Sequence, residues 1–81
     1  MRYSLLIEKV LDNSLPQGYY YAHVPALDLT THGLGIEGAK EAATDLIRLW
    51  IAEKQENHEL IPREDESYFA SIEIADALFG S

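Results

Sequence analysis

The chain has 81 residues, and its fourteen acidic residues against six Lys and Arg give a formal net charge of −8. This length provides for one small domain with a thin core, and the absence of cysteine excludes disulfides and thiolate metal sites. No apolar run approaches the ~18 residues of a membrane-spanning helix, and the first residues lack the apolar stretch of a secretion signal. We therefore expect one cytoplasmic domain over 1–81, with a core over about 2–74 and a short tail over 75–81.

The negative charge argues against nucleic-acid binding. Proteins that bind RNA or DNA gather Lys and Arg on one face to neutralise phosphates, whereas the six basic residues of this chain are scattered singly among acids. An acidic surface can instead attract a basic protein. A large net charge also keeps a small protein dispersed in solution, and charge alone leaves both interpretations open.

The first part of the chain has the pattern of an antiparallel hairpin. Apolar and polar residues alternate over much of 2–11, which predicts a half-buried strand. Turn-forming residues follow over 12–18, and Tyr19–Val24 is a second strand, rich in residue types that favour a sheet. Alternation along this strand places Tyr20, Ala22 and Val24 on one face and Tyr19, Tyr21 and His23 on the other.

A third strand and a helix are expected next. Pro25 ends the second strand, and a short strand is predicted over 27–33. A helix should then run from about Gly35 to Gln55, because apolar residues recur there at three- and four-residue steps. These residues form one stripe, made of Ile36, Ala39, Ala43, Leu46, Ile47 and Trp50.

The predicted fold is α+β, in the order β-β-β-α-β, with a small antiparallel-type sheet and one helix on one face. The last strand is expected over 68–74, where Ala70, Ile72 and Ile74 share a face. A single helix leaves the second face of the sheet without a cover inside the chain. We therefore expect at least a homodimer, or contact with a partner, through the residues of that face: Tyr19, Tyr21, His23 and Phe69.

Several segments together resemble the HicB-like antitoxin family. Residues 19–27 are similar to the strand and Pro-x-Leu corner of that family, and Thr31-His32-Gly33 to the short strand before its helix. Residues 39–42 and 49–51 match the helix pattern of the family, and Ile61-Pro62 matches the segment that follows its helix. The resemblance extends over nearly the whole chain.

The resemblance implies a partial RNase H-like fold and a binding role. It implies that the protein neutralises a small basic HicA-type toxin, an mRNA-cleaving protein, by direct occlusion. The chain departs from the common pattern at Leu29-Thr30, where many members have Gly-Cys, and at Leu34-Gly35, where Asp-Thr is usual. Many members also carry a C-terminal DNA-binding segment; only seven residues follow Ile74, so autorepression is not carried over.

Two alternatives stay open. One is an orphan oligomeric domain, regulatory or structural, that has no toxin partner. The other is an RNase H-like nuclease that binds divalent metal ions through Glu8, Glu41 and Glu73. Strand and helix periodicity places Glu8 and Glu41 apart, so we expect no catalytic, cofactor or metal site. Zinc-ligand spacing is also missing, because the histidines lie on three separate elements: His23, His32 and His58.

Overall fold

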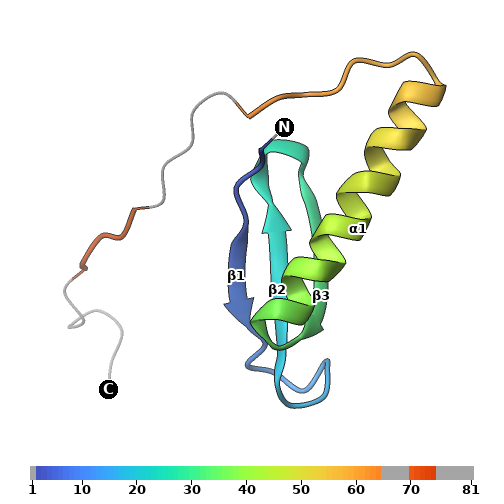
Figure 1. Ribbon diagram of the computed structural model, residues 1–81. Helices are drawn as coiled ribbons and strands as arrows, with labels where there is room; N and C mark the ends of the chain where they lie inside the picture. The colour runs from blue at the N-terminus through green and yellow to red at the C-terminus, as the bar shows by residue number, and fades with distance from the viewer. Residues whose placement is uncertain (1, 65–69, 75–81) are drawn as a thin grey trace.

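The computed structural model describes residues 2–64 and 70–74. Its regular part consists of two layers, a three-stranded antiparallel sheet in the order β1-β2-β3 and one helix, α1, that crosses one face of it (Figure 1). The α+β class expected from the sequence is therefore confirmed. The elements are β1 Leu6–Lys9, β2 Tyr19–Val24, a 3-10 turn η1 at Pro25–Leu27, β3 Leu29–Leu34 and α1 Gly35–Glu56.

The strand register decides which residues face the helix. Ala22 of β2 lies between Ile7 of β1 and Thr31 of β3. Ala22 is fully buried and belongs to one core cluster with Ala39 and Ala43 of α1. Because side chains alternate along a strand, the residues in register with Ala22 face α1 and the neighbouring row faces away.

Most of the predicted bounds agree with the structure, and the differences have local causes. The bounds of β2 are those predicted, and α1 ends one residue later than expected. The first strand is shorter than 2–11, because Leu6 pairs with His23 and Pro25 lies just beyond, without an N–H to extend the sheet. The third strand starts at Leu29 instead of residue 27, because Leu27 belongs to η1.

The final strand predicted over 68–74 is wrong for its described part. Residues 70–74 have no regular secondary structure, and Ile72 and Ile74 are 81% and 60% exposed. An alternating pattern specifies a strand only where a neighbouring strand supplies backbone hydrogen bonds, and no strand pairs with 70–74 in the described chain. Residues 68 and 69, including Phe69, lie outside the described residues.

Small residues bring the two layers close together. Ala39 and Ala43 of α1 are fully buried against the sheet. Gly33 of β3 lies beneath the first turn of the helix, where a side chain would collide with the helix backbone. The core of the described part of the chain is correspondingly thin: its buried hydrophobic residues are Ala22, Val24, Leu27, Ala39 and Ala43.

α1 follows β3 without a linker. Gly35 starts the helix with a φ of 71°, a left-handed conformation that favours glycine, and its N–H donates to the Gly18 carbonyl over 2.8 Å. The N-cap residue, Leu34, provides no side-chain hydrogen bond. No helix within the described residues combines the length and the apolar character needed to span a membrane.

After α1 the chain returns to the N-terminal segment. The Tyr3 hydroxyl donates to the Pro62 carbonyl over 2.6 Å. The Ser4 N–H and Ser4 hydroxyl donate to the two oxygens of the Glu64 carboxylate, over 2.7 Å and 2.6 Å. These bonds to Ser4 favour the ionised carboxylate and lower the pKa of Glu64.

Candidate protein-binding surfaces

One face of the sheet packs on α1, and the opposite face is covered by no element of residues 2–64 or 70–74 (Figure 1). We call this second surface the open face. Its residues follow from the register, since Tyr21 lies between Glu8 and His32 and points away from the buried Ala22 row. The open face consists of Leu6, Glu8, Tyr19, Tyr21, His23, Thr30, His32 and Leu34.

Three polar side chains of the open face have hydrogen-bond partners on the face or in the adjacent loop: Tyr21, His23 and Thr30. His23 Nδ1 lies 2.7 Å from the Thr30 hydroxyl on the neighbouring strand. The Tyr21 hydroxyl lies 3.2 Å from that of Ser14, whose own hydrogen is donated to Asp12, so Tyr21 is the donor. The two bonds from Ser14 lower the pKa of Asp12. Tyr21, His23 and Thr30 can therefore lose their water without being left unpaired.

Aromatic and aliphatic groups fill the rest of the open face. The rings of Tyr19 and His32 are in tilted contact, with centroids 6.0 Å apart. Leu34 at one end is 63% exposed, and Leu6 on β1 is 38% exposed. Large hydrophobic side chains left in water on one contiguous face are typical of a surface that contacts another protein.

The structure brings three of the four predicted interface residues together. Tyr19, Tyr21 and His23 lie on the open face, as alternation along β2 predicts, while Phe69 is outside the described residues. Sequence reasoning missed His32 and Leu34 as members of this face. The signal was the alternation of β3, in which His32 and Leu34 are two residues apart and therefore share a face; the strand predicted over 27–33 ended before Leu34.

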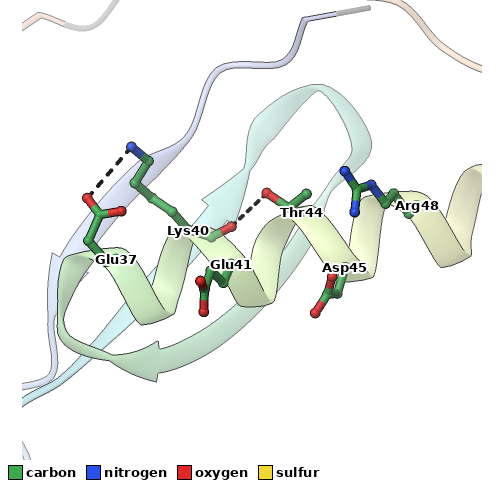
Figure 2. Close-up of a pocket in the computed structure, with 6 residues that line it drawn as sticks. All are labelled: Glu37, Lys40, Glu41, Thr44, Asp45 and Arg48. Carbon is green, nitrogen blue, oxygen red and sulfur yellow. Dashed lines mark hydrogen bonds and ion pairs between the residues drawn. The ribbon is translucent and has the colours of Figure 1, made fainter.

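A second exposed surface lies on the outer side of α1, and Figure 2 shows its side chains. Glu37 pairs with Lys40 over 3.9 Å, and the Thr44 hydroxyl donates to the Lys40 carbonyl over 2.9 Å. Glu41 and Asp45 point to one side of the helix, one turn apart, and neither forms an ion pair with a described residue. This outer face has negative charge available to a cationic partner.

The three carboxylates considered for a nuclease are not brought together. Glu8 lies on the open face, whereas Glu41 lies on the outer side of α1, so the two layers separate them. Glu73 is exposed in the segment 70–74, which runs apart from the sheet in Figure 1. Within the described residues, no group of three or more His, Cys, Asp or Glu is placed to hold a metal ion. The geometry gives no support to the two-metal arrangement.

Comparison with known proteins returns no family model, no curated protein and no solved structure that matches the chain. The function therefore has to be inferred from the surfaces that the described fold leaves uncovered. The open face carries one formally charged residue, Glu8, whereas the outer face of α1 is rich in charge. The two surfaces therefore suit different kinds of partner.

Proposed function

We propose that the protein is a HicB-like antitoxin with a partial RNase H-like topology, and that it neutralises a small basic HicA-type mRNA-cleaving toxin. It acts by covering the toxin and performs no chemistry of its own. The resemblance in the sequence motivates this proposal. Two antiparallel strands, a short third strand and one helix on a single face support it over residues 2–56.

The observation that carries the proposal is a pair of carboxylates on the exposed helix face that form no ion pair with a described residue; on this face three acidic residues lie beside two basic ones. Glu41 and Asp45 point to the same side of α1 and have no described cation within ion-pair distance. The chain as a whole, these two carboxylates included, has a net charge of −8. Two unpaired carboxylates one turn apart are suited to bind Lys and Arg side chains of a basic protein.

Charge complementarity also explains how binding would inhibit. An mRNA-cleaving protein needs Lys and Arg side chains to hold phosphates. An acidic protein that occupies those side chains competes directly with RNA for the same contacts. Inhibition then requires only that the two proteins dissociate slowly enough to keep RNA from binding the toxin. No residue of this chain has to take part in a chemical reaction.

Co-expression tests the proposal. The chain should be produced together with the product of the adjacent reading frame, provided that this product is short and basic. Only one of the two proteins should carry an affinity tag. We expect the two proteins to purify as a stable complex and the toxin's growth arrest to be relieved. The double variant Glu41→Lys/Asp45→Lys should lose both effects.

A matched control separates charge from folding. The variant Leu60→Lys adds a cation at a side chain that is 95% exposed and lies beyond the end of α1, away from both carboxylates. It should bind as the original chain does. Failure of the original chain to form a complex with the basic protein at about 10 µM, well above the dissociation constants of stable complexes, would overturn the proposal.

A further inference from the structure

We propose that the open face is the interface of a homodimer, in which two sheets stack face to face about a two-fold axis that runs along β2. This inference goes beyond the toxin-binding function and does not depend on it. The two surfaces lie on opposite sides of the molecule, since α1 covers the other face of the sheet (Figure 1).

The low charge of the open face favours a second copy of the chain as its binding partner. Glu8 is the one formally charged side chain on that face, although the chain as a whole carries −8. A basic protein would find a single carboxylate there, and a nucleic acid would find no Lys or Arg. Two copies can meet through this face while nearly all of their acids stay in solvent, where salt screens them over about 8 Å.

The register then distinguishes between two arrangements of the pair. Glu8, Tyr21 and His32 form one row across the sheet, with Tyr21 in the middle. Stacked sheets keep their strands within about 30° of each other, so a two-fold axis near Tyr21 runs either along β2 or across it. An axis along β2 exchanges the positions of β1 and β3, and each Glu8 faces His32 of the other copy.

The alternative axis, across the strands, stacks each edge strand on its own counterpart. Glu8 would then face Glu8, and His32 would face His32. Two carboxylates in contact repel, whereas a carboxylate accepts a hydrogen bond from an imidazole N–H. The axis along β2 is therefore favoured, and it forms the Glu8–His32 contact twice.

The size of the open face sets the strength of the dimer. Three short strands present roughly 400 Å² per copy, about half of what each partner buries in a standard interface. Exposed apolar side chains contribute at both ends of the face, through Leu6 and Leu34. We expect a dimer with a dissociation constant on the order of 10 µM, weak by the standard of permanent assemblies.

Sedimentation equilibrium of the full chain tests the dimer directly. We expect a species of twice the 9.1 kDa chain mass to dominate at about 100 µM. The variant Tyr21→Glu places two carboxylates at the axis and should abolish that species. A chain that stays monomeric at about 200 µM would overturn the inference.

Charge variants test the direction of the axis. With Glu8 against His32, both Glu8→Lys and His32→Glu should weaken the dimer about tenfold, and the double variant should recover most of the loss. Glu8→Gln should weaken it slightly. Tighter pairing of Glu8→Gln, or no recovery in the double variant, contradicts the axis along β2. Both residues are exposed, so circular dichroism should show an unchanged fold.

Cross-linking gives an independent readout, because the chain contains no cysteine. Tyr21→Cys puts one thiol next to its symmetry mate, and mild oxidation should give a disulfide-linked dimer. Thr44→Cys on the outer side of α1 is the matched control and should remain a monomer under the same conditions. Equal cross-linking of the two variants would mean random collision and would refute the interface.

Discussion

Gly33 of β3 lies so close to Gly38 of α1 that a Cβ on Gly33 would be 2.3 Å from the Gly38 carbonyl carbon and oxygen. Atoms at that separation overlap, and both belong to backbone that cannot rotate away. The close approach lets the buried Ala39 and Ala43 reach the sheet. It also makes the two glycines unequal, because a Cβ on Gly38 would find its nearest neighbour at 3.5 Å, an ordinary contact.

We therefore predict opposite effects for alanine at these two positions. Gly33→Ala should lower the free energy of unfolding by about 3 kcal/mol, since it overpacks a contact that has no room. Gly38→Ala should be neutral or should stabilise by up to ~1 kcal/mol, because alanine favours a helix. Urea unfolding followed by circular dichroism measures both. Equal losses in the two variants would contradict the described contact between β3 and α1.

The exposed segment 70–74 gives a second prediction. Ile72→Asp should change the free energy of unfolding by less than about 0.5 kcal/mol, as expected for a surface site, since Ile72 is 81% exposed and pairs with no strand. Val24→Ala is the contrasting variant and should cost about 2 kcal/mol, because Val24 is fully buried. A large loss in Ile72→Asp would show that the segment packs as a strand after all.

The bonds between Ser4 and Glu64 give a prediction for acid conditions. They lower the pKa of Glu64 in the folded chain below its ordinary value of 4.5. A lowered pKa means that the carboxylate favours the folded state above pH 4.5, and that this contribution is lost as the pH falls through the folded-state pKa. NMR titration should show the Glu64 carboxyl and the Ser4 amide changing together, with a midpoint below 4.5. Ser4→Ala should raise that midpoint, and a midpoint of 4.5 or above in the original chain would contradict the contact.

Salt gives a prediction that separates the two proposed interfaces. The complex with a basic protein should weaken at least tenfold between about 0.05 M and 0.5 M salt, because screening shortens the range of the Glu41 and Asp45 charges. The homodimer should change little or tighten, since its contacts are mainly apolar and its distant acids repel. Isothermal titration calorimetry and sedimentation measure the two effects. A complex with the basic protein that salt leaves unaffected would show that charge does not hold it together.

The elements with a strong local pattern could be predicted from the sequence. β2 has a run of tyrosines ended by Pro25, and α1 has an apolar stripe, so both were located to within a residue. The alternation of β2 also placed Tyr19, Tyr21 and His23 on one face. These predictions needed only local spacing, because each element carries its own start or stop signal.

Features that depend on how the elements pack against one another could not be predicted. The length of β1 is set by its pairing with β2, and the role of Gly33 is set by the close approach of α1 to β3. The alternation over 70–74 predicted a strand, but pairing decides whether one forms. Alternation along β3 groups His32 with Leu34, but the register of β3 with β2 decides that they lie on the open face.

Val24 is the largest side chain that the described structure buries completely. Apart from Val24 and Leu27, the buried hydrophobic residues of the described structure are alanines, so we expect the unbound form to open often and to expose peptide bonds to proteases. Any partner that binds only the folded chain lowers that open population by mass action. The lifetime of this protein in a cell should therefore follow the concentration of whatever binds it, with the bound fraction persisting and the surplus degraded.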